Sequence, residues 1–173
     1  MALTYFKDGA WRTPGGLVAV KSVLKTDTQV ESAVAAGASF DVTGLSITHA
    51  LSDASNKLII SAYFGIAQES TFVGRVGIAV ADNGTLINVA DVAGTRFRFT
   101  AGVRNAPGTN DSGAMPSFMN VYSPGDTNSH TYTVRAISGR AAAMDIYINR
   151  TVADIDGANP RATSGLVIQE VSV

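Results

Sequence analysis

The two histidines have the widest chemical range of any side chains in this sequence, because imidazole serves as a general acid or base and as a metal ligand. His49 ends a predicted strand and His130 follows a predicted turn. Neither has a second potential ligand nearby at a spacing typical of a metal site. Folding can bring distant residues together, but lone histidines are more often surface or capped residues. We therefore expect no metal site here.

An acidic segment, residues 154–159, carries the carboxylate and amide oxygens that bind calcium. Its spacing does not fit an EF-hand loop, because Gly157 directly follows Asp156 and no closing glutamate is present. Asx turns in a surface loop explain these residues better. Arg150 and Arg161 bracket the segment, which favours a locally salt-bridged loop over a ligand site.

Catalytic patterns are absent from the sequence. The chain has no cysteine, no Gly-x-Ser-x-Gly motif and no glycine-rich loop that opens a helix. A carboxylate pair for glycoside cleavage forms only in space, so the 14 acidic residues leave that alternative open. We expect a protein that is not an enzyme and that holds no cofactor.

Two arginines, Arg96 and Arg98, lie on one face of a predicted strand over residues 95–101. Phe97 and Phe99 lie on its other face. The arginines could bind an anionic partner, but pairing with acidic residues across the sheet is the plainer interpretation.

The composition is poor in charge. Charged residues make up 16% of the 173 residues, against about 25% in a typical soluble domain. The net charge of −1 excludes an overall electrostatic footprint for nucleic acid or an anionic membrane. No signal peptide is recognisable, and no apolar run approaches the roughly 20 residues of a membrane span. We favour a surface partly covered by other subunits, while a coat of Ser, Thr, Asn and Gly is the alternative.

These residues lie on or between short predicted strands, which are separated by turn signals. Residues 40–48 alternate apolar and polar side chains, with Gly44 as a predicted bulge, and a polar turn at 52–56 leads into a second strand. In the last strand, Leu166 and Ile168 lie on one face and Val167 and Val171 on the other, which indicates a core on one side and a neighbouring subunit on the other. About ten strands are predicted, over residues 17–24, 40–48, 57–64, 75–81, 85–89, 95–101, 115–122, 131–137, 143–150 and 164–173.

This spacing predicts an all-β antiparallel sandwich or barrel over residues 17–173. Only residues 30–36 could form a helical turn, and that segment is too short to be stable alone.

Residues 1–16 form an N-terminal arm that differs from the rest. It contains Tyr5, Phe6, Trp11 and Arg12 and ends in a Pro-Gly-Gly hinge. Extended, it could reach about 50 Å, well beyond the radius of gyration of a domain this size. These four residues are our candidates for docking onto a partner; the alternative is a first strand that folds back on its own domain.

Several segments, taken in order, carry a resemblance to a known family. They are 25–28 (KTDT), 40–60, 94–96 (GTR), 123–126 (SPGD), 129–135 (SHTYTVR), 147–150 (YINR), Asp154, Asp156, Arg161, Ser164 and 169–171 (QEV). Together they resemble a family of tailed-phage virion β-sandwich domains, found in small capsid-associated proteins and at the ends of tail fibres. The resemblance covers residues 20–173 and leaves out the arm. It implies a jelly-roll-like sandwich, a homotrimer and no catalysis.

Two functions are consistent with the sequence. The first is a capsid cement or decoration protein that is assembled in the host cytoplasm, binds the major capsid protein and its own copies at the capsid surface, and contacts neither nucleic acid nor membrane. The second is a receptor-binding module of a tail fibre or head fibre, with host recognition in the loops 105–113 and 151–163.

Overall fold

The computed structural model describes residues 5–7, 10–12, 15–68, 75–104, 113–157 and 159–173, with the backbone alone for the first two segments. Within these residues the chain forms fourteen β-strands and no helix. The strands are β1 (Tyr5–Lys7), β2 (Ala10–Arg12), β3 (Leu17–Lys25), β4 (Gln29–Val34), β5 (Ser39–Ala50), β6 (Lys57–Tyr63), β7 (Ile66–Gln68), β8 (Arg75–Asp82), β9 (Thr85–Ile87), β10 (Ala101–Arg104), β11 (Ser117–Tyr122), β12 (Ser129–Ser138), β13 (Met144–Ile148) and β14 (Ser164–Val171).

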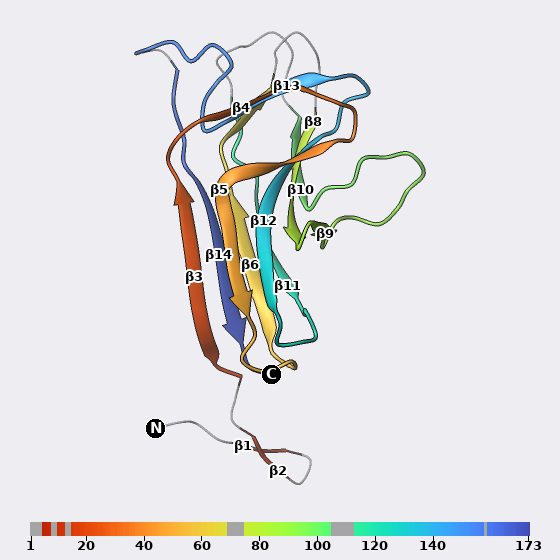
Figure 1. Ribbon diagram of the computed structural model, residues 1–173, viewed down its shortest axis with the longest axis vertical. Coiled ribbons are helices and arrows are strands. Elements are labelled where there is room, and N and C mark those ends of the chain that lie inside the picture. Colours follow the sequence, from red (N-terminus) through yellow and green to blue (C-terminus); the bar gives the residue numbers. More distant parts are fainter. Residues whose placement is uncertain (1–4, 8–9, 13–14, 69–74, 105–112, 158) are drawn as a thin grey trace.

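Two antiparallel sheets form the sandwich (Figure 1). One has the strand order β11-β6-β14-β3, and the other has the order β10-β8-β12-β5 with β9 paired to β8. Eight strands carry this sandwich: in chain order β3, β5, β6, β8, β10, β11, β12 and β14. When these eight strands are renumbered 1 to 8 in chain order, the sheet β11-β6-β14-β3 has the order 6-3-8-1 and the sheet β10-β8-β12-β5 has the order 5-4-7-2. This wrapping is the double Greek key of a jelly roll and confirms the predicted fold class.

A smaller sheet, β4-β13-β7, closes one end of the sandwich (Figure 1). Its strands come from three separate connections, β3 to β5, β6 to β8 and β12 to β14, which all turn at that end. Residues 30–36, the candidate for a helical turn, therefore lie largely in a strand. β13 supplies the backbone partners that this short segment lacks by itself.

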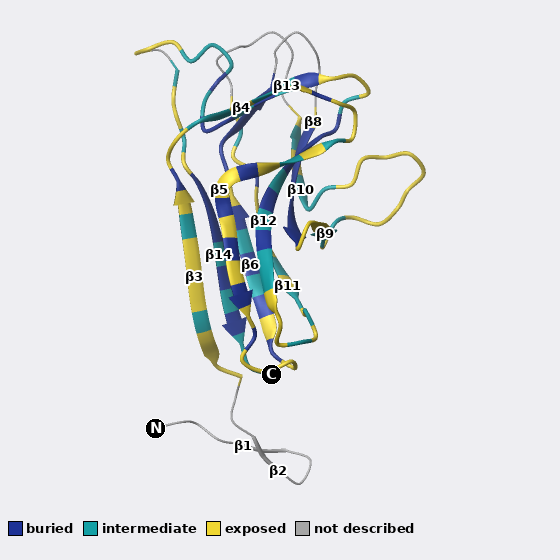
Figure 2. Cartoon of the chain, in the orientation of Figure 1, coloured by how far each residue is buried: buried dark blue, intermediate teal, exposed yellow. Residues whose placement is uncertain are grey.

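The core follows the alternation in the sequence (Figure 2). Along β6, Leu58, Ile60 and Ala62 are buried and the residues between them point outward. In β14, Leu166 and Ile168 are buried in the same way. Complete burial of a side chain of this size stabilises the fold by roughly 1.5–3 kcal/mol, so these inward rows hold the two sheets together.

Backbone features agree with two local predictions. Asn83 and Gly84 have φ of 46° and 87°, and they join β8 to β9 in the tight hairpin that this dipeptide favours. Gly44 has φ of 84°, and the pairing of β12 with β5 shifts register beside it. The shift leaves extra residues on β5, as the predicted bulge requires.

One predicted strand is wrong. Residues 95–100 form a loop, and β10 begins only at Ala101. The alternation of Phe99 with polar residues reflects its packing and not a strand. The Phe99 ring lies over Gly77 on β8 and Gly102 on β10, which face each other. A Cβ on Gly77 would lie 1.9 Å from the Phe99 ring, so a bare backbone is required there.

Candidate functional site

The outward side of the sheet β11-β6-β14-β3 is a surface of the sandwich that is almost free of charge. We call it the apolar face, and its residues are Val20, Ser22, Leu24, Ile59, Ser61, Tyr63, Met119, Val121, Val167, Gln169 and Val171. Each alternates with a residue that points into the sandwich. Among the outward positions of these four strands, all of them described, only Lys57 at one end is charged.

Strand register places these side chains in continuous rows. Gln169 lies between Val20 and Ile59, and Ile59 faces Val121 on the next strand. The adjacent row runs from Ser22 through Val167 and Ser61 to Met119. In a third row, the Tyr63 ring lies against Gly165, which has no side chain to displace it.

Several of these apolar side chains are open to solvent. Met119 is 71% exposed, Leu24 61%, Val121 59% and Val20 52%. Contiguous exposed apolar surface of this kind marks an interaction site in soluble proteins, whereas single exposed residues do not. The sequence predicted part of this face, because the apolar outward residues of the last strand indicated that another subunit covers it. The residues that β3, β6 and β11 add to the face can be identified only from the strand register.

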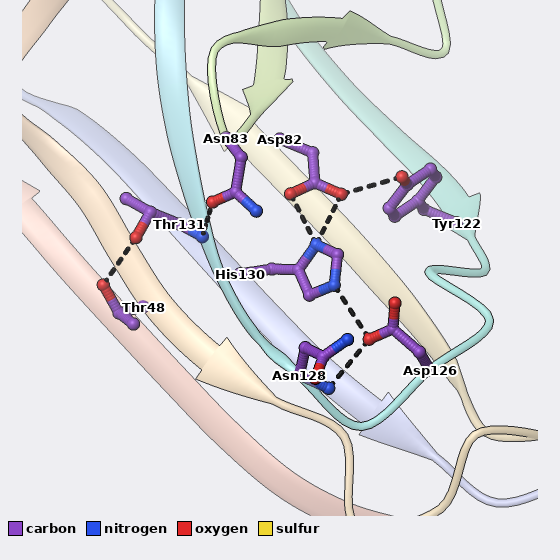
Figure 3. Close-up of polar contacts among 8 residues, drawn as sticks. All are labelled: Thr48, Asp82, Asn83, Tyr122, Asp126, Asn128, His130 and Thr131. Atoms are coloured by element: carbon purple, nitrogen blue, oxygen red, sulfur yellow. Dashed lines mark hydrogen bonds and ion pairs between the residues drawn. The ribbon is translucent and has the colours of Figure 1, made fainter.

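The outer side of the opposite sheet has different chemistry. Ser46 and Thr133 hydrogen-bond through their hydroxyls at 2.9 Å. Thr48 and Thr131 form the same contact at 3.0 Å, which Figure 3 shows. Asp41 accepts a hydrogen bond from Nε of Arg135 at 2.6 Å. Paired hydroxyls and an exposed ion pair are stable in water, so the surface over β5 and β12 needs no partner.

His130 belongs to a polar cluster at the arm end of the sandwich, where β3 begins and β14 ends (Figure 3). Its Nδ1 lies 2.7 Å from Oδ1 of Asp82, and its Nε2 lies 3.1 Å from Oδ1 of Asp126. The hydrogen bond to Asp82, then that to Asp126, raises the pKa of His130. Protonated His130 therefore stabilises the fold below pH 6.5, and this contribution disappears as the pH rises through the folded pKa.

Tyr122 completes this cluster by donating a hydrogen bond to Oδ2 of Asp82 at 2.8 Å. Burial, with the hydrogen bond to Asp82, raises the pKa of Tyr122 to about 12. The cluster joins the ends of β8 and β11, the start of β12 and the turn between β11 and β12. Its hydrogen bonds hold these segments together at the arm end of the sandwich.

His49 belongs to a second cluster, built around the buried carboxylate of Glu170. Oε1 of Glu170 accepts hydrogen bonds from the Ser52 backbone and hydroxyl, at 2.8 and 2.6 Å, and from Asn56 at 2.7 Å. Nε2 of His49 lies 2.9 Å from Oε2. Burial alone would raise the pKa of Glu170, but the hydrogen bonds from Ser52, Asn56 and His49 outweigh it and lower the pKa to about 2. The cluster fixes the turn after β5 to the last strand.

The acidic loop forms the predicted local ion pairs. Asp154 lies 2.9 Å from Arg161 and 3.5 Å from Arg150, and the hydrogen bond from Arg161 lowers the pKa of Asp154. Asn159 closes a turn by accepting a hydrogen bond from the Ile155 backbone at 2.7 Å. Across the described residues, no three His, Asp or Glu side chains are grouped to hold a metal ion.

The arm is described through its backbone only. β1 and β2 pair as a hairpin, in which Tyr5 is opposite Arg12 and Phe6 is opposite Trp11. The side chains of these four residues lie outside the described part of the chain, so docking by the arm stays a prediction. Gly16 accepts a backbone hydrogen bond from Ser172 at 3.0 Å, which fixes the base of the arm beside the C-terminal end of β14.

Comparisons with known proteins give structural likeness alone. No protein-family model matches the chain, and no curated protein matches its sequence. Similar solved structures include a chain from the infectious bursal disease virus particle (14% identity, TM-score 0.44, covering 98% of this chain and 39% of that one) and a chain from the Gx strain of that virus (12%, 0.41, 99% and 44%). A third is dimeric latent PorU from Porphyromonas gingivalis (11%, 0.36, 93% and 14%).

This chain therefore spans less than half the length of either viral chain. At TM-scores below 0.5, these likenesses carry no argument about function. The resemblance to tailed-phage virion domains stays a prediction. No helix among the described residues has the length and hydropathy to cross a membrane.

Proposed function

We propose that this protein is a structural component of a virion, and specifically a cement or decoration protein on the capsid of a tailed phage. The observation that carries the proposal is the apolar face, a four-stranded sheet surface with one charged residue at its margin. Such a surface gains free energy when another protein covers it, at about 25 cal/mol per Å² of apolar area. A protein that works by this burial needs no catalytic groups.

The major capsid protein is the proposed occupant of the apolar face. The arm ends where β3 begins, so an arm docked on the shell would hold this sheet against the same partner. Further copies would complete a homotrimer at the local three-fold positions of the shell, where trimer symmetry matches capsid symmetry. The protein would then act at the capsid surface as a non-enzymatic clamp between shell subunits.

Copy number per virion tests this function. We expect hundreds of copies in purified virions, counted by quantitative mass spectrometry against the major capsid protein. Image reconstruction of the same particles should place them on the shell. A few copies confined to the tail would contradict the cement function.

Receptor binding remains a second candidate, and a cavity at the end opposite the arm favours it. This cavity of about 220 Å³ lies beside the loop 151–163, with Ile66, Met115 and Ala162 in its apolar wall and Arg150 and Arg161 at its polar side. The loop 105–113, predicted to share this function, lies almost wholly outside the described residues. Specific adsorption of the purified protein to host cells, lost when the loop 151–163 is replaced, would support this candidate.

A further inference from the structure

An arginine-lined hollow lies on the sheet opposite the apolar face. Arg75 begins β8, Arg104 ends β10, and the register places them directly opposite each other. Arg96 joins them from the loop that precedes β10. Two adjoining hollows, of about 400 and 450 Å³, share Arg75 together with the rings of Phe97 and Phe99. The site is therefore a cationic surface with an aromatic floor.

These three arginines lack partners within the part of the chain that the structure describes. No hydrogen bond or ion pair there involves the guanidinium group of Arg75, Arg96 or Arg104, whereas Arg135 and Arg161 both bind aspartates. Like charges directly opposite each other on neighbouring strands destabilise a sheet. A bound anion between Arg75 and Arg104 would remove that repulsion.

The loop that carries Arg96 is held in place. Phe99 is seated over Gly77 and Gly102, and Phe97 lies against Gly37. The backbone of Thr100 donates to Ile78 at 2.9 Å, and its hydroxyl donates to the carbonyl of Asn88 at 3.0 Å. The arginines therefore project from a fixed platform, which lowers the entropy cost of binding a ligand.

We propose that this hollow binds an acidic peptide segment of a partner protein. Carboxylates would pair with the guanidinium groups, which bind planar oxyanions in bidentate geometry. The aliphatic part of a glutamate would cover Phe97, which is 37% exposed. Nucleic acid fits less well, because such binding draws on many phosphate contacts and the chain has a net charge of −1. The site adds a second contact surface and does not depend on the function proposed for the apolar face.

Titration calorimetry with a hexaglutamate peptide tests the proposal, at low salt of about 50 mM so that screening is weak. We expect measurable binding that weakens at least about tenfold in Arg75→Gln and in Arg104→Gln, since each removes a charged hydrogen-bond partner. Arg98→Gln is the matched control. It removes the same charge from the loop that carries Arg96 but lies outside the hollow, and it should change the affinity less than about twofold.

Thermal unfolding of the free variants gives an independent readout. Arg104→Gln should raise the unfolding midpoint, because it relieves the repulsion with Arg75, and this also shows that the variant folds. A lower midpoint would contradict the like-charge argument.

Three binding results would overturn the proposal. The first is absence of hexaglutamate binding, and the second is equal weakening by Arg98→Gln. The third is tighter binding of a twelve-residue oligothymidylate than of hexaglutamate, with the same dependence on Arg75, which would assign the site to nucleic acid.

Discussion

The two outer sheet surfaces of this jelly roll have opposite chemistry on the same scaffold. On β5 and β12 of the sheet β10-β8-β12-β5, hydroxyl pairs and the ion pair of Asp41 with Arg135 satisfy the outward side chains, and Phe99 covers the glycines of β8 and β10. On the sheet β11-β6-β14-β3, Met119, Val121 and Val20 stand in solvent. The chain thus satisfies the outward side chains of β5 and β12 itself and leaves the apolar face uncovered, which indicates that a partner covers the apolar face.

Charged substitutions on the apolar face should have the strongest consequences for assembly. Met119→Lys and Val121→Lys should each weaken attachment to the shell on the order of 100-fold or more, because an unpaired charge buried in an interface costs about 3–5 kcal/mol. Thr43→Lys, an exposed position on the other sheet, should leave attachment unchanged. Binding of purified variants to particles stripped of the protein measures the difference. Equal occupancy by all three variants would remove the functional distinction between the sheets.

A second effect comes from acid, which protonates Glu170 near the end of β14 in the apolar-face sheet. The folded pKa of Glu170, about 2, is below its unfolded value of 4.5, so the stability that it provides above pH 4.5 disappears as the pH falls towards 2. This contribution is about 3 kcal/mol. Urea unfolding at several pH values should show a shallower acid dependence in Glu170→Gln than in the parent protein. Asp91→Asn, at an exposed loop carboxylate, is the control, and an unchanged slope in Glu170→Gln would contradict the assignment.

A third prediction tests whether the opposite sheet is completed by its own chain. Gly77→Ala should lower the free energy of unfolding by about 1–3 kcal/mol, because the new methyl group occupies the place of the Phe99 ring. Adding Phe99→Ala should make the Gly77 substitution much less costly in a double-mutant cycle. Gly16→Ala, which meets no atom closer than 4.0 Å, should have little effect on stability. If the effects of Gly77→Ala and Phe99→Ala on the free energy of unfolding were purely additive, the Phe99 ring would not occupy the space beside Gly77.

The smallest effect concerns the hydroxyl pairs on the polar surface. Thr48→Val removes one partner of Thr131 at an exposed position and should cost roughly 0.2–1 kcal/mol. Val121→Thr makes the reverse change on the apolar face and should alter the stability of the free protein by no more than about 0.5 kcal/mol. Chemical denaturation measures both, and a cost well above 1 kcal/mol for Thr48→Val would show that this surface is not simply solvated.

Sequence patterning predicted an antiparallel sandwich or barrel, and the family resemblance implied its jelly-roll form. Patterning failed where the alternation of apolar and polar residues had a different cause. The inward rows of β6 and β14 follow directly from their apolar periodicity. Phe97 and Phe99 produce the same pattern in a loop, because glycines on other strands receive their rings. No local signal reveals that arrangement.

The histidine clusters were beyond local inference for a related reason. Asp82 lies 48 residues from His130, and Glu170 lies 121 residues from His49. Only the sandwich topology brings these groups together at the arm end. The apolar face was predicted in part. The sequence indicated the covered side of β14, but the contribution of the other three strands required the strand register.

Burial of the apolar face on the particle can be measured directly through cysteine labelling. The chain has no cysteine of its own, so Met119→Cys and Thr43→Cys each introduce a single thiol, one on each sheet surface. Both should react rapidly with a maleimide in the free protein. On assembled particles we predict that Met119→Cys is protected at least about tenfold while Thr43→Cys still reacts at its free rate, as desolvation of one face requires. Full reactivity of Met119→Cys on the particle would contradict the central claim that this sheet face is the assembly surface.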